Sequence, residues 1–212
     1  MVAQKIIAYC SLATSKSCRR ALHAYPWRWI LGPYAPWGWE NKIDRDFALD
    51  NGAWTCFQKG IPFQDQKFID CVEKYGHRAD WIVVPDCVGN KSKTMEMIRS
   101  WAPKLAKYRQ LVAVQDGMVE SDIASYLAGG AGIFVGGSTD WKLDTLPYWA
   151  QTARRYGAIV HCGRVNTMRR INLCIANGYT SFDGSGVSRF AIHARKISSY
   201  LHLQDRQLKL WG

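Results

Sequence analysis

Eight short, β-rich apolar runs alternate with longer amphipathic segments along this chain, and this alternation limits the fold more than any other feature. Strands that alternate with helices form a parallel sheet, because a helix must carry the chain back between two parallel strands. Eight such strands are the number that closes a sheet into a barrel. The sequence therefore predicts an α/β, TIM-like (β/α)8 barrel, with strands over residues 5–10, 27–31, 47–50, 80–86, 111–115, 132–137, 158–163 and 180–186.

A single compact domain over residues 1–212 is expected to hold all of these strands. No internal repeat, low-complexity stretch or linker divides the chain, and 212 residues is short for this fold, so some helices must be short or replaced by loops. The competing architecture is an open, doubly wound sheet. It lacks support, because no G-x-G-x-x-G follows the first strand.

Seven segments have a helical pattern. Gly157 and Gly178 stand where a glycine ends a helix in the left-handed conformation, and Asn166 is a candidate N-cap. Pro103 kinks or splits the helix that contains it. The predicted helices cover residues 15–25, 65–76, 92–108, 120–130, 143–157, 166–178 and 189–204.

Charge and cysteine usage point to a partner and a compartment. The chain has 28 Lys and Arg against 17 Asp and Glu, a net charge of +11, which favours a polyanion such as nucleic acid; a merely basic surface is the alternative. No apolar run is long enough to span a membrane and no signal peptide is evident, so we expect a cytoplasmic protein. The seven cysteines form no C-x-x-C pair, so we expect reduced, mostly buried thiols.

Polar residues or glycines stand at the carboxyl end of six of the eight predicted strands, where barrel active sites form. Each follows an apolar run that would lie in the barrel wall. Each candidate also has a structural alternative. The Asp-Asn-Gly, Gln-Asp-Gly, Gly-Gly and Asp-Gly sequences are typical of tight turns, and the histidine can lie in the core with its hydrogen bonds satisfied. The candidates are Asp50, Asp86, Gln115, Gly136 with Gly137, His161 and Asp183.

These side chains suit chemistry at the N-glycosidic bond of a purine. Two carboxylates across a pocket can divide the roles of nucleophile and acid–base catalyst, as in glycosidases. A glutamine amide and backbone N–H groups can bind the edge of a heterocycle. A carboxylate matches the N1–H and 2-amino donors of guanine.

Five motifs, in order over residues 45–186, resemble those of tRNA-guanine transglycosylases: FALDNGAW, VVPDCVG, VAVQDG, GIFVGGSTDWK and GRVNTMRRINLCIANGYTSFDGSG. The chain is more similar still to the smaller relatives that place 7-deazaguanines in DNA, in phages and bacterial modification islands. The resemblance implies that the expected compartment is the host cytoplasm if a phage encodes the chain. The resemblance implies a queuosine-related glycosyltransferase (a pentosyltransferase) that replaces guanine in DNA with a free 7-deazaguanine base.

The resemblance also implies the catalytic residues. Asp183, in the family's Phe-Asp motif, attacks C1′ of a flipped or single-stranded guanosine to give a covalent glycosyl-enzyme. Guanine leaves, and N9 of the incoming base restores the nucleoside. Asp50, in the place of the family's Asp-Ser-Gly-Gly motif, transfers protons at the two bases, and the site must keep water off the intermediate.

Base recognition is implied for a second group of residues. Asp86 binds the base edge, and Gln115 with the backbone of Gly136 and Gly137 completes the contacts. His161 is grouped with them, although the tRNA enzymes have an apolar residue there. Its other possible roles are a phosphate contact, help in proton transfer, or packing.

Two departures from the family concern zinc and the polymer. The tRNA enzymes carry a C-terminal zinc site of cysteines and a histidine, and no such motif occurs here, so we expect no zinc and no other cofactor. The missing tRNA-binding extension favours DNA over tRNA as the partner.

Basic and aromatic side chains are expected to hold the polymer. Tryptophans near the reactive face, above all Trp54 and Trp141, are candidates for stacking on bases; those of residues 27–39, with Tyr34, either stack or pack over the barrel flank. Phosphate contacts are expected from basic residues in the loops that follow the strands. These are Lys91, Lys93, Lys142, Arg164 and Arg189.

Three other functions remain open on this sequence. A tRNA-guanine transglycosylase shares the chemistry but takes a structured anticodon loop. A barrel-type nucleoside N-glycosidase uses the same carboxylates with water as acceptor. A catalytically silent nucleic-acid-binding barrel needs the basic residues but not Asp183.

Overall fold

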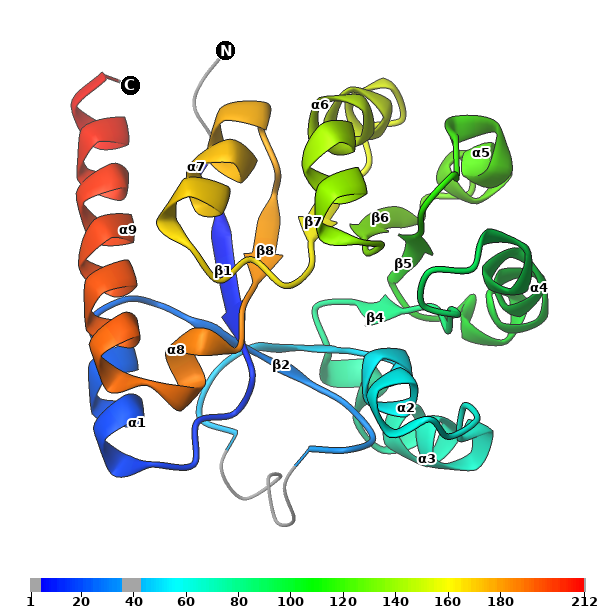
Figure 1. The fold of residues 1–212 in the computed structure, drawn as a ribbon, viewed down its shortest axis with the longest axis horizontal. Helices are drawn as coiled ribbons and strands as arrows, with labels where there is room; N and C mark the ends of the chain where they lie inside the picture. Colours follow the sequence, from blue (N-terminus) through cyan, green and yellow to red (C-terminus); the bar gives the residue numbers. More distant parts are fainter. Residues whose placement is uncertain (1–4, 36–42, 212) are drawn as a thin grey trace.

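The computed structural model describes residues 5–35 and 43–211, with side chains up to Arg206, and it confirms the predicted (β/α)8 barrel. The eight strands pair in parallel and in sequence order, and the last strand closes the barrel on the first (Figure 1). They are β1 (Ile7–Cys10), β2 (Arg28–Leu31), β3 (Phe47–Leu49), β4 (Ile82–Val83), β5 (Gln110–Val114), β6 (Gly132–Val135), β7 (Val160–Cys162) and β8 (Ser181–Asp183).

Helices surround the strands (Figure 1), and all seven predicted helical segments are present. Gly178 ends α7 in the left-handed conformation as expected, and Pro103 splits its predicted helix by starting a separate 3-10 turn. The elements are α1 (Lys16–Leu22), α2 (Ala53–Lys59), α3 (Asp65–Tyr75), η2 (Gly76–Arg78), α4 (Lys91–Trp101), η3 (Pro103–Leu105), α5 (Glu120–Ala128), α6 (Thr139–Arg155), α7 (Met168–Asn177), α8 (Gly186–Arg189) and α9 (Ala191–Trp211).

The helices depart from the prediction at α2, α8 and the N-cap of α7, and α6 begins earlier than predicted, at Thr139. The short helices α2 and α8, of seven and four residues, were not predicted, and four residues are too few to show a helical period. The predicted N-cap Asn166 is wrong: Thr167 caps α7 by accepting from the Arg170 amide at 3.3 Å. The Asn166 side chain instead accepts from the Gly186 amide at 2.9 Å, so it ties α8 to the loop that precedes α7.

Aromatic side chains fill the interior of the barrel. Trp81 lies against Tyr9 and His161, with ring centroids 5.2 and 4.8 Å apart, and Phe134 stacks on His161 at 5.0 Å. The Tyr9 hydroxyl donates to Asp80 at 2.8 Å. The barrel interior is therefore a packed core, and a cavity lies above it, where the loops begin.

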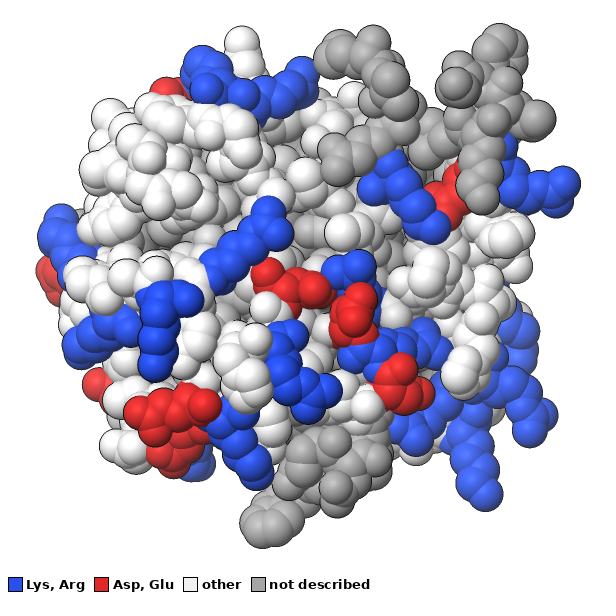
Figure 2. All heavy atoms as spheres, turned by 180° about the vertical axis from the view of Figure 1, so that it is seen from behind, with Lys and Arg blue, Asp and Glu red and all other residues white. Residues whose placement is uncertain are grey.

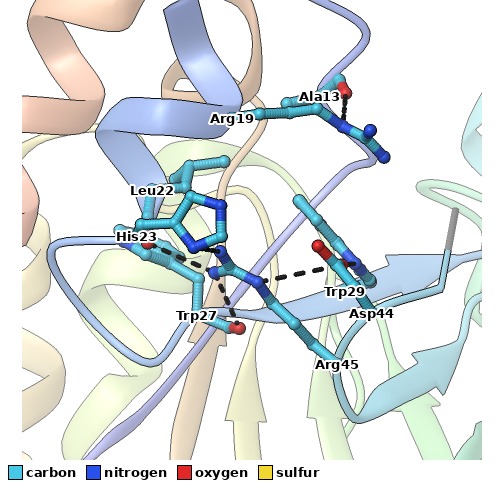
Figure 3. Close-up of polar contacts among 8 residues, drawn as sticks. All are labelled: Ala13, Arg19, Leu22, His23, Trp27, Trp29, Asp44 and Arg45. Atoms are coloured by element: carbon cyan, nitrogen blue, oxygen red, sulfur yellow. Dashed lines mark hydrogen bonds and ion pairs between the residues drawn. The ribbon is translucent and has the colours of Figure 1, made fainter. Parts of the chain in front are cut away.

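Two of the tryptophans of residues 27–39 pack over the barrel flank. Trp27 and Trp29 are buried; their indole N–H groups donate at 2.9 Å to the Ser198 hydroxyl and to Asp44. Figure 3 shows Arg45 beside them, where its guanidinium donates to the carbonyls of Leu22 and Trp27 at 3.2 and 3.3 Å. These contacts therefore join α1 to β2 and to α9.

Lys and Arg side chains cover much of the surface. Figure 2 shows them over the face seen from behind, with Asp and Glu in smaller groups beside them. All seven cysteines are free, and six of them are buried. Among the described residues, no helix is both long and apolar enough to cross a membrane.

Candidate active site

A cavity of about 790 Å³ lies at the carboxyl ends of the strands. Its walls come from the loops that follow β1, β2, β3, β4, β5, β6, β7 and β8, because parallel strands all end at one rim. Residues far apart in the sequence meet there. The predicted site residues that line it are Asp50, Asp86, Gln115, Gly136, Gly137, Arg164, Asp183 and Arg189.

Asp86 is held between two amide side chains. Asn51 donates to Oδ1 at 2.7 Å and to the Val84 carbonyl at 3.0 Å, while Gln115 donates to Oδ2 at 2.5 Å. Burial raises the pKa of Asp86 to about 6, although these two hydrogen bonds and the charge of Arg164 oppose the rise. The carboxylate is thus fixed in orientation and is charged at neutral pH.

Gln115 connects Asp86 to two backbone segments. Its Oε1 accepts from the amides of Gly89 and Gly137, at 3.1 and 3.0 Å. A Cβ on Gly136 would lie 2.7 Å from Gln115 Nε2, so this position requires a glycine. The Gly136 amide itself bonds to the Val114 carbonyl at 3.0 Å. Both glycine amides are thus bonded within the protein in this conformation, and both glycines line the cavity, so their predicted part in base recognition stays a prediction.

Asp50 has a pKa near neutrality. Burial raises that pKa to about 7, the charges of Asp183 and Asp86 add to the rise, and a hydrogen bond from the Gly52 amide (3.0 Å) opposes it. A carboxyl group with this pKa is present in both protonation states at pH 7. It is therefore suited to give a proton in one step and to accept one in another.

Asp183 is held by two donors on one oxygen. His161 Nε2 lies 3.1 Å from Oδ1, and the Arg164 amide donates to the same atom at 3.2 Å. Ser181 completes a line, with its hydroxyl 2.8 Å from His161 Nδ1. These contacts fix the carboxylate so that it faces the cavity.

Arg164 has an unusual backbone and covers one side of the cavity. Its φ of 60° lies in the left-handed region, which non-glycine residues seldom adopt and which often marks functional sites. The guanidinium donates to the Gly137 carbonyl and lies 4.2 Å from the ring centroid of Trp54. Arg164 thus donates its backbone amide to Asp183, the predicted nucleophile, and its guanidinium stacks on Trp54 in the cavity wall.

The two tryptophans predicted to lie near the reactive face, Trp54 and Trp141, have different surroundings in the structure. Trp54 lines the cavity and is 37% exposed, as expected of a stacking residue. Trp141 does not line it; its ring lies under Gly137 and next to Trp149, 6.3 Å between centroids. Tyr34 lines the cavity, whereas Trp37 and Trp39 lie outside the described residues.

Several of the predicted phosphate contacts are corrected by the structure. Lys142 is buried, and its ammonium donates to the Gly163 carbonyl at 2.5 Å. The reason is that α6 begins at Thr139, so Lys142 lies on the inner face of a helix and not in a loop. Lys91 pairs with Asp122 at 2.7 Å; Lys93 is exposed away from the cavity; Arg189 lies at its mouth.

The prediction that His161 contacts a base is also wrong. The side chain is fully buried inside the barrel and reaches only Ser181, Asp183 and the surrounding aromatic rings. Burial lowers its pKa, which favours the neutral imidazole even beside the Asp183 carboxylate. It is therefore a positioning residue.

Sequence reasoning missed Asn51 and Ser181. Asn51 follows Asp50 and was considered only as part of an alternative tight turn, yet it is buried and bonded to Asp86. Ser181 could have been found from strand geometry, because it stands two residues before Asp183 and so points to the same side of β8. No group of three or more His, Cys, Asp or Glu side chains suited to a metal ion occurs among the described residues.

Comparison with models of known protein families gives no match to this chain, and a search of curated proteins gives none either. The resemblance to transglycosylases therefore rests on the five sequence motifs. What the structure adds is independent of that resemblance. It places three carboxylates, Asp50, Asp86 and Asp183, around one cavity on the rim of a closed (β/α)8 barrel.

Proposed function

We propose that this protein is a base-exchange transglycosylase that replaces a guanine in DNA with a 7-deazaguanine. The proposal rests on one observation: three carboxylates in one cavity have three different environments. Asp183 is fixed by donors on one oxygen, Asp50 titrates near neutrality, and Asp86 is clamped by two amides. These environments match a nucleophile, an acid–base group and a base-binding group.

In the first half of the reaction, an Asp183 oxygen forms a bond to C1′ of the target nucleoside. The bond from C1′ to N9 of guanine breaks, and its electron pair stays on N9, which takes the proton of Asp50. The products are a glycosyl ester on Asp183, free guanine and the Asp50 carboxylate.

In the second half, N9 of the incoming 7-deazaguanine loses its proton to Asp50 and forms a bond to C1′. The ester bond to Asp183 breaks and the carboxylate is restored. Two displacements retain the configuration at C1′. Asp50 returns to its starting protonation state, so a pKa of about 7 lets one group serve both halves.

Guanine-type bases are favoured by the Asp86 carboxylate. It is charged at neutral pH and accepts from Asn51 and Gln115 along fixed directions, which leaves acceptor capacity toward the cavity. The N1–H and 2-amino groups shared by guanine and 7-deazaguanines are a matching pair of donors. Adenine has no such pair.

A base-exchange assay tests the proposal. The protein is incubated with guanine-containing DNA, or with tRNA, and 7-cyano-7-deazaguanine; the polymer is digested and its nucleosides are analysed by mass spectrometry. We expect the deazaguanine deoxynucleoside with the wild-type chain and none with Asp183→Ala. Incorporation into tRNA alone would make the substrate tRNA. Release of guanine without incorporation would indicate an N-glycosidase that uses water.

A further inference from the structure

The charge of this protein is divided between two halves of the barrel. Residues 40–144 hold 15 of the 17 Asp and Glu and 13 of the 28 Lys and Arg, a net charge of −2. The rest of the chain holds 15 Lys and Arg against two acids, a net charge of +13. Because β8 closes the barrel on β1, the beginning and the end of the chain form one continuous side of the molecule.

Neither of the two acids in this half offsets the charge of its outer surface. Asp183 lies in the cavity, and Asp205 forms an ion pair with Lys5 at 2.5 Å. The helices α1, α8 and α9 pack against one another, side by side at the lower left of Figure 1. Five exposed residues on them form what we call the basic arc: Lys16, Arg20, Arg189, Arg195 and Lys196.

The basic arc begins at the cavity. Ser15 and Arg189 line the cavity, and Lys16 directly follows Ser15. None of the five cations makes a hydrogen bond or ion pair with another residue of the described part of the chain, unlike Lys91 and Lys142. Unpaired cations in a part of the chain with only two acids give a strong positive field, and a chain of phosphates is a matching ligand.

Exposed apolar side chains lie among the cations of the basic arc, next to the cavity. Phe190 is 56% exposed and follows Arg189, and its ring lies 5.3 Å from that of His193. Ile192, beside them, is 64% exposed. An aromatic ring among cations is the usual arrangement for binding single strands, because the phosphates pair with the cations and a base stacks on the ring.

We infer that single-stranded DNA runs along the basic arc, over α1, α8 and the start of α9, with a base next to the target stacked on Phe190. The target nucleotide then enters the cavity between Ser15 and Arg189. This inference rests on the proposed function for the identity of the polymer. Of the predicted phosphate contacts in the loops after β4, β6, β7 and β8, the basic arc keeps Arg189, and it runs along the side of the barrel where the two ends of the chain meet.

Binding of a fluorescent 20-nucleotide DNA strand, without any free base, tests the arc separately from catalysis. One variant changes Lys16, Arg20, Arg195 and Lys196 to Gln; the matched control changes Arg99, Lys104, Lys107 and Arg109 to Gln. Both lower the net charge from +11 to +7. For the arc variant we expect affinity at least about 30-fold lower at 0.1 M salt and a salt slope smaller by about 3, at roughly 0.7 per lost contact. The control should lose less than about 3-fold.

Phe190→Ala gives a second measurement that leaves the charge unchanged. Its matched control is Leu203→Ala, because Leu203 is also on α9 and is 57% exposed. We expect about 5-fold or greater loss of affinity for Phe190→Ala and no change for Leu203→Ala. If the quadruple variant does not fold, the pairs Lys16→Gln with Arg20→Gln and Arg195→Gln with Lys196→Gln replace it.

Equal loss of affinity in the arc variant and its control would show that single-stranded DNA does not run along the basic arc. The proposed function would still stand if the wild-type chain exchanges bases in the assay above. If the wild-type chain binds neither single-stranded DNA nor duplex DNA nor tRNA at low salt, both the inferred path of the DNA and the proposed function are wrong.

Discussion

His161 Nε2 lies 3.1 Å from Asp183 Oδ1 inside a barrel interior closed to solvent. Burial lowers the pKa of His161, so the ring is neutral and has one N–H. If Nε2 donates that hydrogen to Asp183, Nδ1 must accept from the Ser181 hydroxyl, which lies 2.8 Å away. His161 and the Arg164 amide together engage Oδ1, and no described residue donates to Oδ2, so Oδ2 is the oxygen that would attack C1′.

Replacing His161 is therefore expected to lower the rate of the chemical step and not the affinity for DNA. His161→Leu should reduce kcat about 10- to 100-fold with KM for DNA unchanged, because it removes the donor that orients Asp183. His161→Gln, which can still donate, should recover part of the loss. Steady-state exchange kinetics give the split. A His161→Leu protein with wild-type kcat would show that His161 only fills space.

The two halves of exchange should depend on pH in opposite directions. Guanine release needs protonated Asp50, whereas attack by the incoming base needs its carboxylate, and its pKa is about 7. Formation of the covalent complex, measured with DNA and no free base, should slow above pH 7. Transfer from the isolated complex to 7-cyano-7-deazaguanine should speed up over the same range. Asp50→Asn should slow both and remove both pH dependences; rates independent of pH between 6 and 8 in the wild-type chain would contradict the assignment.

Asp50 should also make the folded protein less stable at alkaline pH. The unfolded chain loses this proton near the ordinary value of 3.8, while the folded protein keeps it to about pH 7, so the folded state binds more protons in between. Stability contributed by the group is full below about pH 4 and is lost as pH rises to 7. Asp50→Asn should raise the free energy of unfolding by about 1–2 kcal/mol at pH 8 and change it little at pH 4, in urea titrations. An equal effect at both pH values would exclude this cause.

Asn51 should be important for stability as well as for the orientation of Asp86. Asn51→Ala removes hydrogen bonds to Asp86, to the Val84 carbonyl and from the Ala53 amide, all in a buried place. We expect a loss of about 1–3 kcal/mol in urea unfolding, because buried polar groups lose their partners. Gln66→Ala, an exposed amide, is the matched control and should change stability by less than about 0.5 kcal/mol. Equal effects would mean that the Asp86 clamp adds nothing.

The sequence by itself determined the eight strands and their order. Each strand is a short apolar run that is recognisable locally, and parallel order follows from the helices between them. It also placed Asp50, Asp86 and Asp183 on one rim, because all parallel strands of a closed barrel end on the same side. Short helices and helix boundaries were less determined, as the unpredicted α2 and α8 and the earlier start of α6 show.

Only the tertiary structure decided what each polar side chain contacts. Lys142 turns inward because α6 begins earlier than its sequence pattern indicates, and His161 points into the barrel, where it meets Ser181 on the neighbouring strand. The closure of β8 on β1 joins two acid-poor ends of the chain into one basic side. These contacts join different elements of the chain, about 20 residues apart for Lys142 and His161 and at opposite ends of the sequence for β1 and β8, and no local pattern of residues specifies them.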